Sequence, residues 1–215
     1  MLVDVITRNP RPRPGASRRA VALAALACVG AAVLVVLGLV AGQGTQATAA
    51  AAAVPILAPA TGATGRPVDG IDSATAEQLA FHVHAHLQIY VDGQQRAVPA
   101  GIGVVPPLQV RQTAQGPFVL GGAGIYWLHT HDSSGVVHIE SPVERRFTLG
   151  ELFDLWGQQL GPNQVGPARG PVTALVDGAV VGGDPRGIPL TAHTVVQLDV
   201  GAPVPFQPYA FPRGL

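Results

Sequence analysis

Residues 81–93 read FHVHAHLQIYVDG, and they carry the strongest structural pattern in the chain. Apolar residues occupy every second position, and the positions between them include His82, His84 and His86. Side chains of a β-strand point alternately to its two faces. This spacing therefore predicts a half-buried strand with an apolar face and a row of imidazoles on the opposite face.

A second histidine-bearing stretch, residues 125–141, reads IYWLHTHDSSGVVHIES. The segment DSSG at 132–135 is typical of a turn, so it predicts a hairpin of strands 125–131 and 136–141. In the register set by this turn, His129 lies opposite His138. A shift by one residue would scatter the polar side chains. The side chains that share one face in this register are His129, His131, His138 and Glu140.

The remaining pattern predicts an α+β fold. Thr148 and Glu151 form a capping box, an apolar stripe follows, and Gly161-Pro162 ends the predicted helix. Further strands are predicted at residues 172–176, 179–181 and 194–200. The order from residue 125 suits one mixed β-sheet packed on one main helix, and this element order is similar to the β-grasp arrangement. The stretch 81–105, with a turn at Asp92-Gly93, is predicted to be an extra N-terminal β-hairpin.

Residues 20–42 are an uncharged apolar run, long enough to cross a bilayer as one transmembrane helix. Residues 1–19 contain five arginines and a single acid, which predicts a cytoplasmic N-terminus and an extracytoplasmic remainder. A cleaved signal peptide is the alternative, with Ala47 and Ala49 near a plausible cleavage site. In that case the remainder would be secreted.

Composition divides the rest of the chain into three parts. Residues 43–68 are rich in Ala, Thr, Pro and Gly and predict a tether. Residues 69–201 form the predicted histidine-rich domain, and residues 202–215 form a proline-rich tail. After residue 42 there are eight arginines against twelve acids and no lysine, so no basic patch for nucleic acid is expected.

The donor atoms available in the domain are nitrogen and oxygen. The single cysteine, Cys28, lies in the apolar run, and the single methionine is Met1. These facts exclude thiolate zinc, iron–sulfur, blue-copper and methionine-rich copper(I) sites. The candidate ligands are His82, His84, His86, His129, His131, His138, Glu140 and Asp132. This set favours Cu(II) or Zn(II), and it also suits Fe(II) or Ni(II).

Each candidate ligand has a simpler interpretation. Alternating histidines also suit a buried hydrogen-bond network or a solvated strand face. Asp132 fits the chemistry of its turn, and Glu140 fits a surface acid that pairs with Arg145 or Arg146. His193, just before the last predicted strand, is expected to be a turn or packing residue rather than a ligand.

Metal binding, sensing or transfer outside the membrane is the function that this pattern favours. A metal-dependent enzyme that uses the same ligands is one alternative, and a protein-interaction module without metal is another. The sequence contains no Gly-x-Ser-x-Gly elbow, phosphate loop or His-Glu-x-x-His motif, so it leaves open whether a reaction is catalysed.

The segments FHVHAHLQIYVDG, WLHTHDSSGVVHIESP and RRFTLGELFDLWG together resemble an uncharacterised family of membrane-anchored bacterial and archaeal proteins. The resemblance covers residues 80–200, and its most specific part is the string HTHD…SG…HIE. It implies no activity, cofactor or substrate. The functional hypothesis therefore rests on the residues themselves.

Overall fold

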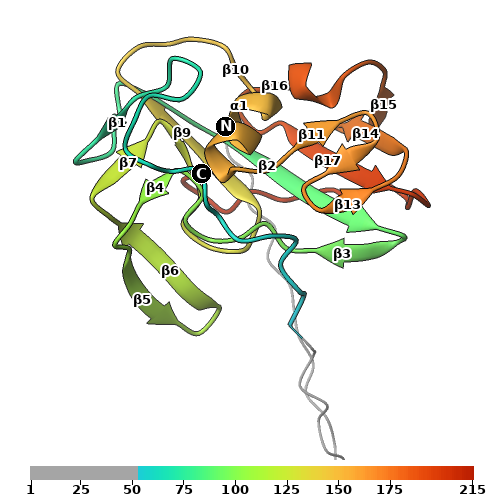
Figure 1. Ribbon diagram of the computed structural model, residues 1–215, viewed down its shortest axis with the longest axis horizontal. Coiled ribbons are helices and arrows are strands. Elements are labelled where there is room, and N and C mark those ends of the chain that lie inside the picture. The colour runs from blue at the N-terminus through green and yellow to red at the C-terminus, as the bar shows by residue number, and fades with distance from the viewer. Residues whose placement is uncertain (1–52) are drawn as a thin grey trace, which may run out of the picture. The chain divides into compact units, whose positions relative to one another are not determined.

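The computed structural model describes residues 53–215, and its main element is a mixed β-sheet (Figure 1). The strands of this seven-stranded sheet are β2 (Phe81–Val91), β3 (Gln94–Arg96), β8 (Leu128–His129), β9 (Val136–Ser141), β14 (Val172–Val176), β15 (Ala179–Val181) and β17 (Val195–Val200). They lie in the order β15-β14-β17-β2-β9-β8, and β3 pairs with the second half of β2. Strands β2 and β17 are parallel, whereas the other pairs are antiparallel.

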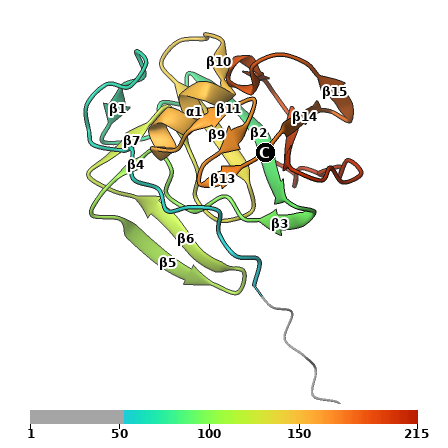
Figure 2. The same cartoon turned by 45° about the vertical axis from the view of Figure 1, so that its right-hand side comes forward.

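Short elements surround this sheet. They are β1 (Ser73–Ala74), β4 (Val104–Val105), β5 (Gln109–Thr113), β6 (Gly116–Gly121), β7 (Gly124–Tyr126), β10 (Phe147–Thr148), β11 (Leu160–Gly161), β12 (Gln164–Val165), β13 (Ala168–Arg169), β16 (Pro189–Leu190), the helix α1 (Leu149–Trp156) and the 3₁₀ turn η1 (Pro185–Gly187). Strands β5 and β6 form a hairpin that projects on the side away from β15 (Figure 2). The described residues thus contain mostly β-structure with one α-helix, in agreement with the predicted mixed sheet.

Helix α1 begins as the sequence predicts and ends earlier. The Thr148 hydroxyl accepts a hydrogen bond from the Glu151 N–H, and the Glu151 carboxylate accepts one from the Thr148 N–H at 2.7 Å. Gly157 has a φ of 77°, and its N–H donates to the Asp154 carbonyl at 3.0 Å. This left-handed cap stops the helix before Leu160, which lies in β11 and still buries its side chain.

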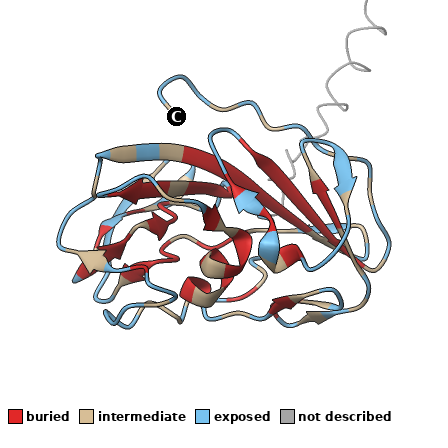
Figure 3. Cartoon of the chain, turned by 90° about the horizontal axis from the view of Figure 1, so that it is seen from above, coloured by how far each residue is buried: buried red, intermediate tan, exposed pale blue. Residues whose placement is uncertain are grey.

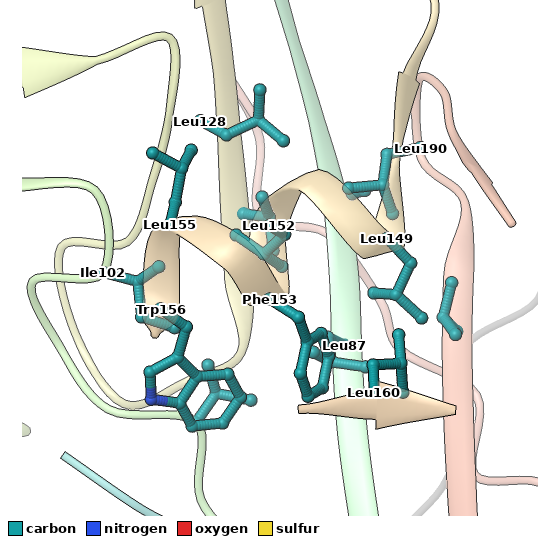
Figure 4. Close-up of a cluster of buried hydrophobic side chains, with 14 of the residues drawn as sticks. Leu87, Ile102, Leu128, Leu149, Leu152, Phe153, Leu155, Trp156, Leu160 and Leu190 are labelled. Atoms are coloured by element: carbon teal, nitrogen blue, oxygen red, sulfur yellow. The ribbon is translucent and has the colours of Figure 1, made fainter. Parts of the chain in front are cut away.

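The core lies between α1 and the apolar face of the sheet (Figure 4). Leu152, Phe153 and Trp156 are fully buried on the helix, and Leu87 and Leu128 contribute from the sheet. The burial of apolar surface of this kind stabilises a fold by about 25 cal/mol per Å². The alternation in residues 81–91 thus directs one face of β2 to this core.

Strand β2 is central rather than an additional piece at the N-terminus. It pairs with β9 on one side and with β17 on the other. The hairpin predicted for 81–105 is also shorter, since β3 ends at Arg96 and residues 104–105 pair with β7. The order predicted from residue 125 is kept, since β8, β9, α1, β14 and β15 follow one another along the chain with shorter elements between them.

Residues 53–68, which lie within the predicted tether, pack on the domain. The Leu57 N–H donates to the Ala97 carbonyl at 2.9 Å, and the Trp156 indole N–H donates to the Ala58 carbonyl at 3.2 Å. The transmembrane helix predicted at 20–42 lies outside the described residues. Within residues 53–215, no helix has both the length and the hydropathy needed to span a bilayer.

The proline-rich tail, residues 202–215, contains no helix or strand and runs over the sheet face opposite α1 (Figure 3). The Gln88 side-chain amide donates a hydrogen bond to the Gln207 carbonyl. The Gln207 N–H in turn donates to the Gln197 side chain at 2.9 Å. The tail therefore covers part of the polar face that also carries the histidines.

Candidate metal centre

Three neighbouring strands bring the histidines together on one face of the sheet. In the register of β2 with β9, His84 lies opposite His138 and His82 lies opposite Glu140. In the register of β9 with β8, His138 lies opposite His129. Directly paired residues direct their side chains to the same face. The predicted facing of His129 and His138 is confirmed, and the two histidine-bearing stretches meet.

Four donor atoms in this row form a closed ring. The Nε2 atoms of His82 and His84 are 3.1 Å apart, and His84 Nε2 is 3.2 Å from His138 Nδ1. Glu140 Oε1 lies 3.2 Å from His138 Nδ1 and 3.1 Å from His82 Nε2. Two ligands of a tetrahedral zinc ion, each about 2.0–2.1 Å from the metal, are about 3.3–3.4 Å apart. In a square-planar arrangement with the same bond lengths they are about 2.9 Å apart, so the ring lies between the two geometries.

Hydrogen bonds alone cannot satisfy this ring. Each facing nitrogen carries at most one hydrogen, and a nitrogen that donates has no lone pair left to accept. If each hydrogen is donated to only one acceptor, at most two of the four contacts can be hydrogen bonds. The remaining contacts carry no hydrogen bond of their own. A cation bound inside the ring would be ligated by all four donor atoms.

A second group of donors adjoins the ring. His129 Nε2 lies 3.2 Å from His131 Nε2, and His131 Nε2 lies 3.4 Å from Glu77 Oε1. His129 Nδ1 lies 3.0 Å from the Tyr126 carbonyl oxygen, and His131 Nδ1 contacts the Val119 carbonyl oxygen. A carbonyl oxygen only accepts, so each Nδ1 carries a hydrogen, and in the neutral ring each Nε2 presents a lone pair. Such backbone contacts orient the histidine ligands of many metal sites.

The electrostatic environment keeps donors available near neutral pH. Burial lowers the pKa of His84 to about 4, and the neighbouring His138 and His82 act in the same direction. Burial lowers the pKa of the fully enclosed His129 to about 3. Burial would raise the pKa of Glu140, but the hydrogen bond with His138 and the nearby imidazoles outweigh it and leave the pKa below its usual range. Neutral imidazoles and an ionised carboxylate are the forms that bind metals.

Two of the predicted ligands lie outside these groups. The ring of His86 stacks on Tyr209 of the tail at a centroid distance of 3.6 Å, and its Nε2 lies 2.9 Å from the Ser134 carbonyl oxygen. Asp132 accepts a hydrogen bond from the Ser134 N–H at 2.9 Å, as expected of a turn residue. Among the described residues, the sets of three or more clustered donors include neither His86 nor Asp132. The donors that the structure brings together are His82, His84, His129, His131, His138, Glu140 and Glu77.

Glu77 was missed by the sequence analysis. It lies between β1 and β2, in a segment with no periodic pattern, so nothing local indicates its role. Strand β6 was also missed, and its Phe118 ring stacks on His131 at 4.9 Å. His193 is in none of the sets of clustered donors among the described residues, although its backbone N–H donates to the His84 carbonyl oxygen at 2.7 Å. Its Nε2 is 2.8 Å from the Leu215 carbonyl oxygen.

A cavity of about 270 Å³ opens onto the donors. His82, His84 and His131 form its polar wall, and Phe118 and Leu120 form an apolar wall. A small molecule in this cavity would contact the same nitrogen atoms that face one another in the ring. Comparison with protein-family models, with curated proteins and with solved structures finds no match for this chain.

Proposed function

We propose that this protein is a membrane-anchored, extracytoplasmic transition-metal-binding protein. His82, His84, His138 and Glu140 hold the metal ion in this proposal, and Cu(II) or Zn(II) suits the donor set best. Residues 20–42 provide the anchor, and residues 1–19 stay in the cytoplasm. Binding, sensing or transfer of the metal at the cell surface is the role that follows.

The closed ring of donors is the observation that carries the proposal. Its contacts, all at 3.1–3.2 Å, match the spacing of ligands around one small ion. Two of its members, His84 and Glu140, are only 4% and 2% exposed. Buried polar atoms in such close contact are stabilised by a partner that satisfies all of them, and a cation in the ring would do so.

The cavity beside the ring supports a second candidate, a metal-dependent enzyme that uses the same ligands. An ion whose accessible side faces a cavity can keep one coordination position for water or substrate. The cavity of about 270 Å³ has room only for a small substrate. A purified, metal-loaded chain that binds no small ligand at its metal would count against this candidate.

Metal analysis of the full-length chain, purified in detergent, tests the main proposal. We expect bound transition metal in the wild-type chain and a marked loss in His84→Ala. The matched control is His193→Asn, since His193 is exposed and has a φ of 60°, which asparagine tolerates. Equal metal content in all three chains, or no metal in any of them, would overturn the proposal.

Membrane extraction tests the anchor separately. The full-length chain should stay in the membrane pellet after alkaline washing, whereas a chain without residues 1–42 should be soluble. Recovery of the full-length chain in the supernatant, shortened at its N-terminus, would instead support a cleaved signal peptide.

A further inference from the structure

We propose that the site holds two metal ions, with the Glu140 carboxylate bridging them. The inference builds on the proposed function, which requires only the ion in the ring formed by His82, His84, His138 and Glu140. The second ion is bound by His129, His131 and Glu77, together with the second oxygen of Glu140. The ligand class is therefore a pair of divalent transition-metal ions.

The facing nitrogens of His129 and His131 are the first observation. Both rings direct Nδ1 to backbone carbonyl oxygens, so in the neutral rings the two Nε2 atoms carry lone pairs, and they lie 3.2 Å apart. In their neutral forms these atoms cannot form a hydrogen bond with each other. Both side chains are at least nine-tenths buried, so water does not screen the repulsion of the lone pairs. A cation between the two nitrogens converts this repulsion into ligation.

The second oxygen of Glu140 is an independent observation. Oε1 faces His82 and His138, whereas Oε2 points towards His129 and lies 3.7 Å from its Nε2. Glu140 is only 2% exposed, and Oε2 has no hydrogen-bond partner within residues 53–215. A buried carboxylate oxygen without a partner is costly. A carboxylate whose two oxygens face two donor groups has the geometry of a ligand that bridges two metals.

Glu77 completes the second group from outside the sheet. Its Oε1 lies 3.4 Å from His131 Nε2, and Glu77, His129 and Glu140 each offer a donor atom within 4.8 Å of the others. A carboxylate beside an imidazole lone pair is unfavourable unless a positive charge lies between them. Because Glu77 is partly exposed, replacing it removes a ligand without opening a hole in the core.

Metal stoichiometry in the full-length chain tests the second site. The purified protein is stripped with a chelator, reloaded with Zn(II), desalted, and analysed for zinc per chain. We expect two ions in the wild type and in His193→Asn. One ion should remain in Glu77→Gln and in His131→Ala. Loading with Cu(II) supplies a second readout in the unmutated chain, because two Cu(II) ions that share a carboxylate interact magnetically in the electron paramagnetic resonance spectrum.

The outcomes separate this inference from the proposed function. A single ion in the wild type, lost in His84→Ala and kept in Glu77→Gln, overturns the second site and leaves the first intact. Two magnetically isolated Cu(II) ions overturn the bridging role of Glu140. The absence of bound zinc from every chain overturns both proposals.

Discussion

Acidification should destabilise the metal-free protein, and His129 allows the effect to be calculated. This side chain is fully buried, and burial lowers its pKa to about 3 from the ordinary value of 6.5. Below about pH 6.5 the unfolded chain binds a proton at this residue, whereas the folded chain stays neutral until about pH 3. The stability that comes from keeping His129 neutral is therefore complete above about pH 6.5 and is lost as the pH falls.

The size of the loss follows from proton linkage. One proton of difference changes the free energy of unfolding by about 1.4 kcal/mol per pH unit. Between about pH 6.5 and pH 4.5, His129 alone therefore accounts for a loss of about 2 kcal/mol. His84 acts with the same sign, because burial also lowers its pKa. The depressed pKa of Glu140 adds to the loss at the acidic end, since protonation of this carboxyl removes its favourable contacts with the imidazoles.

Denaturant unfolding of the chelator-treated full-length chain measures this effect. Midpoints are compared at about pH 7.5, 5.5 and 4.5 for the wild type and His129→Gln. The pH dependence of the free energy of unfolding should be weaker in His129→Gln, by the equivalent of about one bound proton. A wild-type stability that is constant or rises on acidification would refute the reasoning, as would an unchanged slope in His129→Gln.

Three further predictions concern ligand binding and packing. Zn(II) at a thousand times its dissociation constant should stabilise the fold by about 4 kcal/mol and raise Tm by about 8–16 °C. An equally large rise in the Tm of His84→Ala would contradict the assigned ligands. Gly135→Ala should lower the folded yield and the metal content, because Gly135 has a φ of 89° and a Cβ there would lie 2.2 Å from the Leu87 carbonyl oxygen. Gly182→Ala is the control and should behave as wild type, since the space around Gly182 is open. Trp156→Ala should cost about 3–5 kcal/mol in chemical unfolding, because the indole at the end of α1 is fully buried in the core. A cost below about 1 kcal/mol would refute this packing.

The local sequence pattern correctly predicted those strands and helices in which apolar and polar residues alternate with a clear period. The alternation in β2, the capping box of α1 and the register that places His129 opposite His138 all follow from residues close together in the sequence. In each case a short-range rule, such as strand periodicity or helix capping, determines the structure. The polar faces of β2 and β9 were assigned correctly for the same reason.

The pairing of β2 with β9 could not be predicted in this way. Those strands are separated by more than forty residues, and nothing in their alternation specifies a partner. His86 has the same spacing as His84, yet Tyr209 from the distant tail stacks on it and removes it from the cluster. Glu77 enters from a segment without a pattern. Tertiary contacts thus decide which members of a regular row become ligands.

The central claim is that imidazoles from separate strands surround one ion, and anomalous diffraction tests it most directly. Crystals of the metal-loaded protein are measured above and below the absorption edge of the bound metal. We expect an anomalous peak enclosed by His82 Nε2, His84 Nε2, His138 Nδ1 and Glu140 Oε1. A map without a peak among these four atoms, from a protein that retains its fold, would contradict it.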